Sequence, residues 1–133
     1  MKIGALKEIF SGEARVAITP SSAGHLQKLG HEVFVESGAG VRAGFSDEDY
    51  RKAGVTVAAD AAELLRAADV VAKVRQPTPD EIGAMREGQT LISFFYPGQN
   101  PDLLEQAKAQ GITAIAMDMV PRISRAQKMD ALS

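Results

Sequence analysis

The chain has 133 residues, 45% of them hydrophobic and 24% charged, and its net charge is −2. These values are typical of one globular domain and exclude a disordered tail. The interspersed charges also exclude the concentrated basic face of a nucleic-acid-binding protein. The chain holds no cysteine, which excludes a disulfide scaffold, a thiol nucleophile and a cysteine zinc site, and its two histidines have no partners at metal-ligand spacing, so we predict no metal site.

Neither a signal peptide nor a membrane span is predicted. The first ten residues are too short and too charged for a signal peptide, and no apolar run approaches the roughly 20 residues that cross a bilayer. We therefore expect a cytoplasmic domain without direct membrane insertion, at most peripheral to a membrane.

Short apolar runs alternate with amphipathic stretches along the chain. Six runs are predicted to be strands: Lys2–Leu6, Glu32–Glu36, Val55–Ala58, Val70–Val74, Thr90–Phe95 and Thr113–Met119. Helices are predicted between them from their start signals, at Pro20, Ser46, Asp60, Thr78 and Asn100. Continuous apolar strands favour a parallel sheet that is covered on both faces. The order predicts an α/β fold, a three-layer Rossmann-like or flavodoxin-like open, mostly parallel sheet with helices on both faces.

A glycine-rich motif follows the second predicted strand. Residues 38–43 fit the dinucleotide pattern G-x-G-x-x-A, and Asp60 stands near the offset expected of a ribose-binding acid. The acidic segment 46–49 follows where an apolar helix should begin, and its charges would repel a pyrophosphate. We interpret the motif as a turn that needs positive φ, and Asp60 as a helix cap.

Polar residues stand at the carboxyl ends of several predicted strands, which is where ligands bind in open α/β sheets. Arg15 lies in the loop after the first strand, Lys73 and Arg75 end the fourth, and Tyr96 follows the fifth. Arginine there can bind a carboxylate or phosphate through two hydrogen bonds. Solvated surface side chains remain the alternative, so Arg15, Arg75 and Tyr96 are candidate residues of an anion or substrate cleft.

The last segment, residues 121–133, follows a buried strand and is predicted to enter a helix. Gln127, Asp130 and Ser133 recur every third position, and residues three apart share a helix face. Such a polar stripe is typical either of a solvent-exposed face or of a site for a carboxamide and its ribose. No glycine, asparagine or proline ends this helix, so we expect the chain to continue in a longer parent protein.

These last residues carry a family resemblance. The run PRISRAQ at 121–127, with Met129-Asp130 and Leu132-Ser133, resembles the corresponding segment in the α subunits of proton-translocating NAD(P) transhydrogenases. The opening through Lys7-Glu8 to Thr19-Pro20, and the block from 38 to 50, resemble both these subunits and the alanine dehydrogenases. The resemblance implies that residues 1–133 form a single N-terminal lobe of the NAD(H)-binding component, with the following dinucleotide-binding domain absent.

The two relatives differ in the chemistry that they need. Alanine dehydrogenases resemble this chain but use a lysine and a histidine where Arg75 and Tyr96 stand. A tyrosine, with an ordinary pKa of about 10, is a poor acid or base at neutral pH. In a transhydrogenase, hydride passes directly between two nicotinamides, so catalysis is mostly positioning. The resemblance therefore favours a transhydrogenase. An alanine dehydrogenase-type lobe and a non-enzymatic ligand-binding or interaction module remain the alternatives.

The resemblance also implies residue roles, cofactors and partners. The segment Arg122, Ile123, Ser124 and Arg125 would line the NAD(H) cleft. Gln127 would contact the nicotinamide ribose and help set the approach of the partner's NADP(H). Asp130, with Arg122 and Ser133, would hold the carboxamide, so that Gln127 and Asp130 are the catalytic candidates. The expected partners are the NADP(H)-binding and membrane components and a second copy of the subunit, on the cytoplasmic side of the inner membrane.

Overall fold

The computed structural model describes residues 1–119. Its elements alternate along the chain in the order β1 (Lys2–Ala5), α1 (Pro20–Lys28), β2 (Glu32–Glu36), η1 (Val41–Ala43), α2 (Asp47–Lys52), β3 (Thr56–Ala58), α3 (Ala61–Ala67), β4 (Val70–Ala72), α4 (Pro79–Ala84), β5 (Thr90–Ser93), α5 (Leu103–Gln110), β6 (Thr113–Ala116) and η2 (Met117–Met119). The strands form a sheet of order β3-β2-β1-β4-β5-β6, and every pair is parallel. This strand order is the Rossmann one of the two topologies that the sequence left open.

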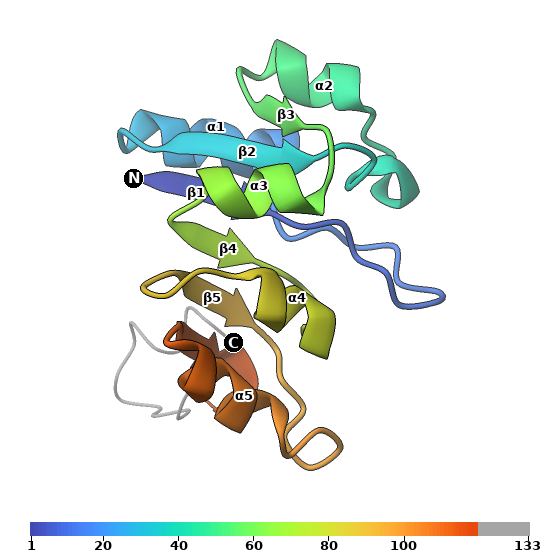
Figure 1. The fold of residues 1–133 in the computed structure, drawn as a ribbon. Coiled ribbons are helices and arrows are strands. Elements are labelled where there is room, and N and C mark those ends of the chain that lie inside the picture. Colours follow the sequence, from blue (N-terminus) through green and yellow to red (C-terminus); the bar gives the residue numbers. More distant parts are fainter. Residues whose placement is uncertain (120–133) are drawn as a thin grey trace, which may run out of the picture.

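Two hydrophobic clusters cover the two faces of the sheet. One cluster joins α3, α4 and α5 to the sheet through buried side chains that include Leu64, Ile82 and Leu91. The other joins α1 and α2 to the β1–β3 half through Ala23, Tyr50 and their neighbours. Figure 1 shows α3 and α4 in front of the sheet and α1 behind it. The predicted three-layer arrangement is therefore present over β1–β3.

Local capping signals place most of the helix starts. Thr19, Ser46 and Thr78 each form a capping box, and the Asp60 side chain accepts from the amide of Glu63. Each capping oxygen satisfies an amide that has no partner within the helix. The predicted starts of α1 to α4 are thus confirmed.

The start of α5 follows the predicted opening Asn100-Pro101-Asp102. The helix begins at Leu103 with Asp102 as its N-cap residue, but Asp102 makes no side-chain capping bond. The Asn100 side-chain amide donates instead to the carbonyl oxygens of Phe95 and Tyr96, at 3.4 and 3.3 Å. Asn100 therefore closes the loop after β5 rather than capping the helix.

Several strands end earlier than their apolar runs predicted, because carboxylates take the next backbone amides. β4 ends at Ala72, and the amides of Val74 and Arg75 donate to Glu8. β5 ends at Ser93, and the amides after Phe94 donate to Asp118. An amide bonded to a side chain cannot extend the sheet ladder. These carboxylates belong to the carboxyl edge of the sheet, where the candidate site lies.

Candidate functional site

The carboxyl ends of β1 and β4 meet at the point where the strand order reverses. β1 pairs with β2 on one side and with β4 on the other. The loop after β1 leads away to α1, and the loop after β4 leads away to α4. In open α/β sheets the crevice between two such loops is the usual ligand site.

A buried ion cluster fills this crevice. The Lys73 Nζ lies 3.4 Å from Glu8 Oε1 and 3.4 Å from Glu81 Oε2, and the three side chains are 0%, 2% and 14% exposed. Glu8 also accepts from the amides of Val74, at 2.7 Å, and Arg75, at 3.0 Å. We call Glu8, Lys73 and Glu81 the inner cluster. The Lys73 ammonium and the amides of Val74 and Arg75 are therefore already paired with carboxylates of the chain.

A second ion cluster lies at the rim of the same edge. Glu13 accepts from Arg15 Nε and Nη2, both at 2.9 Å, and from the Arg15 backbone amide at 2.9 Å. Arg75 Nη1 lies 3.8 Å from Glu13 Oε1. We call Glu13, Arg15 and Arg75 the outer cluster. Arg15 and Arg75 are 66% and 36% exposed, whereas the Glu13 carboxylate that joins them is 5% exposed.

Hydrogen bonding fixes the charges of the outer cluster. The bonds from Arg15 hold the pKa of the Glu13 carboxyl at about 2, below its ordinary value of 4.5. The same side-chain bond raises the pKa of the Arg15 guanidinium. The cluster therefore carries one negative and two positive charges at neutral pH, and this net positive charge favours an anionic or electron-rich ligand.

Aromatic rings flank the second arginine of this cluster. The Arg75 guanidinium lies 4.9 Å from the centre of the Phe10 ring and 5.5 Å from that of Tyr96. The Phe94 ring stacks with Tyr96 at a centroid distance of 6.2 Å. Cations are attracted to aromatic faces at these distances. The stacking therefore holds the guanidinium at the rim.

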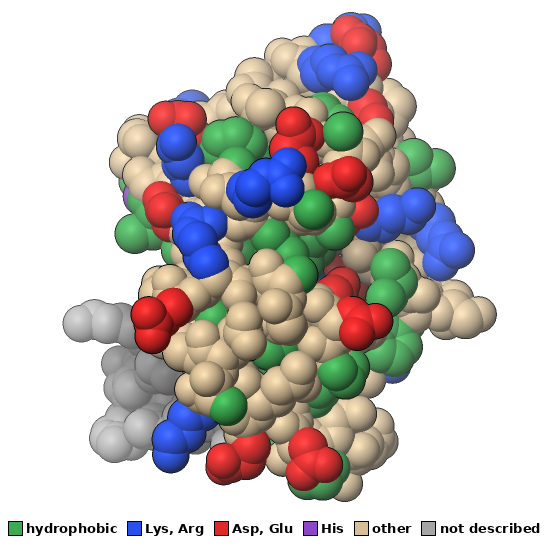
Figure 2. All heavy atoms as spheres, in the orientation of Figure 1, with side chains coloured by type: hydrophobic (Ala, Val, Ile, Leu, Met, Phe, Trp, Pro, Cys, Tyr) green, Lys and Arg blue, Asp and Glu red, His purple; other side chains and the backbone are tan. Residues whose placement is uncertain are grey.

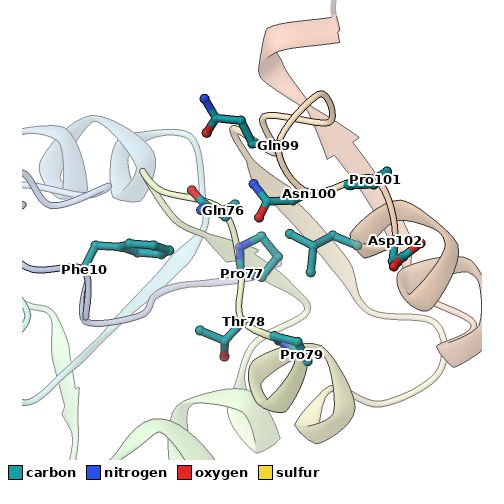
Figure 3. Close-up of a pocket in the computed structure, with 10 residues that line it drawn as sticks. Phe10, Gln76, Pro77, Thr78, Pro79, Gln99, Asn100, Pro101 and Asp102 are labelled. Atoms are coloured by element: carbon teal, nitrogen blue, oxygen red, sulfur yellow. The ribbon is translucent and has the colours of Figure 1, made fainter.

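A pocket of about 400 Å³ adjoins this stack between the loops after β1, β4 and β5. Figure 3 shows Phe10 on one side, Asn100 on the other, and Gln76 and Pro77 between them. Gln76 is 8% exposed, and its Oε1 has no hydrogen-bond partner among the described residues. Mainly apolar walls with a few amides are typical of small-molecule sites.

The glycine-rich motif is a turn that the chain's own side chains occupy. The Gly38 amide, at φ +82°, donates to Asp47 at 2.8 Å, and the Ser37 hydroxyl donates to the same carboxylate at 2.6 Å. These bonds lower the pKa of Asp47. A Cβ on Gly40 would lie 2.6 Å from the Tyr50 ring. The predicted positive φ is confirmed, and the amide that a phosphate would need is already taken.

The structure brings some of the predicted site residues together. Arg15, Arg75 and Tyr96 meet at the rim, as the strand-end pattern predicted. Lys73 does not join them, because its buried ammonium pairs with Glu8 and Glu81. The predicted nucleotide contacts Arg122, Ile123, Ser124, Arg125, Gln127, Asp130 and Ser133 lie outside the described residues.

Sequence reasoning missed the carboxylates of the site. None of Glu8, Glu13, Glu81 and Asp118 was predicted as a site residue, although these carboxylates form the two clusters and bind the amides after β5. An acidic residue in or beside a predicted strand end was the available signal for Glu8 and Asp118. Their amide partners are distant in sequence, however, so no local pattern gives the contacts.

The described residues contain no group that could hold a metal ion and no helix that is long and apolar enough to cross a membrane. On the face that Figure 2 presents, lysine and arginine side chains lie among acidic ones rather than gathering in one patch.

Comparison with known proteins identifies close relatives. The family profile for the alanine dehydrogenase/PNT N-terminal domain matches residues 4–133. The NAD(P) transhydrogenase subunit alpha of Cereibacter sphaeroides is 65% identical over the whole chain, which covers 25% of that protein. The alanine dehydrogenase of Bacillus subtilis is 40% identical over 90% of the chain and 32% of its own length.

Solved structures agree with these relatives. A transhydrogenase from Sinorhizobium meliloti superposes with a TM-score of 0.89 and 39% identity, covering 99% of this chain and 39% of that one. An L-alanine dehydrogenase superposes with a TM-score of 0.87 and 39% identity, covering 94% and 34%. The chain thus spans between a quarter and two fifths of the relatives named here. Since the family profile matches nearly every residue, the chain belongs to the family of alanine dehydrogenase and PNT N-terminal domains.

Proposed function

We propose that this chain is the N-terminal lobe of the NAD(H)-binding component of an NAD(P) transhydrogenase, which transfers hydride between NAD(H) and NADP(H) and couples the transfer to proton translocation. The 65% identity to a transhydrogenase α subunit over all 133 residues supports the proposal. Residues 1–133 form a single lobe in this proposal, and a dinucleotide-binding domain follows it in the parent protein.

The observation that carries the proposal is the composition of the rim, where Glu13, Arg15, Arg75 and Tyr96 meet without a histidine. In the outer cluster no group changes its charge near neutral pH, because Glu13 titrates at about 2 and arginine stays protonated. A tyrosine stands at position 96, where the resemblance places a histidine in alanine dehydrogenases. Direct hydride transfer between two nicotinamides needs no acid or base, whereas amino-acid oxidation does.

In this proposal the described residues form one wall of the NAD(H) site. The pocket and the aromatic rim could receive a planar, polar group at the carboxyl edge. They supply no pyrophosphate site, because Asp47 takes the Gly38 amide and Glu8 takes the amides after β4. Bound NAD(H) would supply the hydride, and the lobe would position and shield its nicotinamide.

The segment 122–133 completes this wall in the proposal. Gln127 and Asp130 are the proposed catalytic residues, and Arg122, Ile123, Ser124, Arg125 and Ser133 would contact the nucleotide with them. The NADP(H)-binding and membrane components are the proposed partners. A homodimer, peripheral to the inner membrane through the complex, is the proposed assembly.

Titration with NADH, followed by fluorescence, tests whether the lobe is half a site. We would compare the 133-residue chain with a chimera in which it replaces the matching residues of the Cereibacter sphaeroides subunit. We expect binding by the chimera alone, because residues 1–119 offer no free pyrophosphate-binding turn. Tight binding by the short chain would show that the Gly38 loop or the segment 122–133 forms a site by itself.

The substitution Gln127→Asn in that chimera tests the proposed catalytic role. We expect hydride transfer to NADP to slow by more than NADH binding weakens, since a shorter amide would misplace the ring and retain most of the contacts. Stopped-flow hydride transfer and equilibrium titration measure the two effects. Turnover near that of the unchanged chimera would contradict the role given to Gln127.

An amino-acid dehydrogenase of the alanine dehydrogenase type is the second candidate. The observation in its favour is Arg15, whose exposed guanidinium keeps donors beyond those bonded to Glu13 and could bind a substrate carboxylate. NADH oxidation by the parent protein that depends on pyruvate and ammonia would establish this activity instead.

A further inference from the structure

Tyr96 has an unusual backbone conformation for its side chain. It is the only non-glycine residue with positive φ among residues 1–119, at φ 49°. Side chains with a Cβ rarely adopt this left-handed region, and they do so when the surrounding structure imposes it. Contacts around Tyr96 must therefore stabilise this backbone conformation.

The Asp118 carboxylate holds the amide side of this residue. Its Oδ2 accepts from the Tyr96 amide at 2.7 Å, and its Oδ1 accepts from the Phe95 amide at 3.0 Å. Charge-assisted bonds of this kind are stronger than bonds between neutral groups. No ion pair to Asp118 occurs within the described part of the chain, so the Phe95 and Tyr96 amides are its hydrogen-bond partners there.

The carbonyl side of Tyr96 is bound as well. Its oxygen accepts from the backbone amides of Gln99 and Asn100, at 2.9 and 3.0 Å, and from the Asn100 side chain at 3.3 Å. These donors belong to the loop that immediately follows. Among the hydrogen bonds of Tyr96 within residues 1–119, only the one to Asp118 reaches a residue beyond this loop, 22 positions along the chain.

The conformation of Tyr96 determines where its ring lies. The ring packs on the Arg75 guanidinium, at 5.5 Å. Arg75 is fixed independently, because its amide donates to Glu8 and its carbonyl accepts from the Ser93 hydroxyl at 2.7 Å. A relaxed, extended backbone at position 96 would direct the ring away from this fixed partner.

We propose that Asp118 is a positioning residue of the cleft: its carboxylate bonds two consecutive amides, keeps Tyr96 left-handed, and so sets the Tyr96 ring against Arg75. The consequence for nucleotide binding rests on the proposed function. The placement of the ring does not, and it can be measured without any nucleotide.

The chain itself offers the probe, because it contains two tyrosines. Tyr50 is fully buried and its hydroxyl donates to the Ile18 carbonyl at 2.7 Å, so it serves as the internal reference. In the 133-residue chain with ¹³C-labelled tyrosine, we expect Asp118→Asn to move the Tyr96 ring resonances toward random-coil values. The Tyr96 change is expected because a carboxamide offers one acceptor oxygen where the two amides need two. The Tyr50 resonances should stay unchanged.

Two comparisons sharpen the experiment. Asp102→Asn makes the same chemical change at an exposed position whose side chain caps nothing, so both tyrosines should remain unshifted. Asp118→Glu keeps both acceptor oxygens on a longer side chain, so the Tyr96 resonances should stay close to their wild-type positions. Tyr96 resonances that are identical in the wild type and in Asp118→Asn would overturn the proposal.

A variant that fails to fold still gives an answer. If Asp118→Asn unfolds the chain because the tyrosine is no longer held, adding Tyr96→Gly should restore folding, since glycine adopts positive φ without strain. Failure of the double variant to fold, measured by circular dichroism, would show that Asp118 supports the fold by another route and would overturn the proposal.

Discussion

The inner and outer clusters pair the same kinds of charges and differ in their exposure to water. In the inner cluster the Lys73 side chain is fully buried beside two carboxylates at 3.4 Å. In the outer cluster the bonds are shorter, at 2.9 Å, but the Arg15 side chain is 66% exposed. A buried charge that loses its partner cannot be rehydrated, whereas an exposed one can.

The comparison shows that distance alone does not rank ion pairs. The shorter pair lies where water screens it, and the longer pairs lie where losing one partner leaves a buried charge. We therefore assign the inner cluster to stability and the outer cluster to the cleft. Substitutions at four residues test this division, from the largest expected effect to the smallest.

Lys73→Met should have the largest effect. Removing the ammonium leaves the carboxylates of Glu8 and Glu81 close together without their cation, which costs about 3–5 kcal/mol in comparable buried pairs. Urea unfolding, followed by circular dichroism, measures the loss. Lys108→Met removes a lysine from an exposed helix position and serves as the control. Equal losses of unfolding free energy in Lys73→Met and Lys108→Met would contradict the assignment of the inner cluster to stability.

Adding Glu8→Gln to Lys73→Met should recover part of this loss. The second change removes one of the two unpaired carboxylates, and neighbouring residues of one network couple by about 0.5–3 kcal/mol. The same urea experiment completes the double-mutant cycle. Strict additivity would show that the two side chains do not interact.

Glu13→Gln should have a smaller effect that depends on pH. The folded-state pKa of about 2 lies below the ordinary value of 4.5. Glu13 therefore stabilises the fold fully above pH 4.5, and this contribution is lost as the pH falls toward 2. The difference in unfolding free energy between wild type and variant should shrink across that window. Glu48→Gln removes a carboxylate from an exposed pair with Arg51 and serves as the matched control.

Arg15→Lys should have the smallest effect on stability. Lysine keeps the charge but cannot reproduce the two parallel bonds to Glu13. The melting temperature should change little and should approach that of the wild type as salt is added, because the Debye length falls from about 10 Å at ~0.1 M to about 3 Å at ~1 M and the Arg15 side chain is exposed. A large decrease in melting temperature that does not depend on salt would show that the outer cluster contributes to stability as the inner cluster does.

The sequence predicted what local residues determine. Ser46, Asp60 and Thr78 sit directly before their helices, so a single side chain and a nearby amide explain each start. Strand positions followed from short apolar runs, because a parallel sheet buries both faces of its strands. The fold class could therefore be predicted from patterns within a few residues.

Distant contacts set what the sequence left open. The predicted end of β4 at Val74 was wrong because Glu8, 66 positions away, takes the Val74 amide. The meeting of Arg15 and Arg75 could be expected from strand ends, but the carboxylate between them could not, since alternation says nothing of side-chain pairing. Asp118 shows the same limit, because its partners Phe95 and Tyr96 lie in the loop after β5, 23 and 22 positions away.

The strand order also has a kinetic consequence. The neighbouring strands β1 and β2, and likewise β4 and β5, are connected through one helix each. The neighbours β1 and β4 are much farther apart in the sequence, and the paired residues Glu8 and Lys73 beyond their ends are 65 positions apart. Because closing a longer loop costs more entropy, we expect the two halves of the sheet to form before they join. The buried ions would then assemble after the rate-limiting barrier, so losing Lys73 should speed unfolding more than it slows folding.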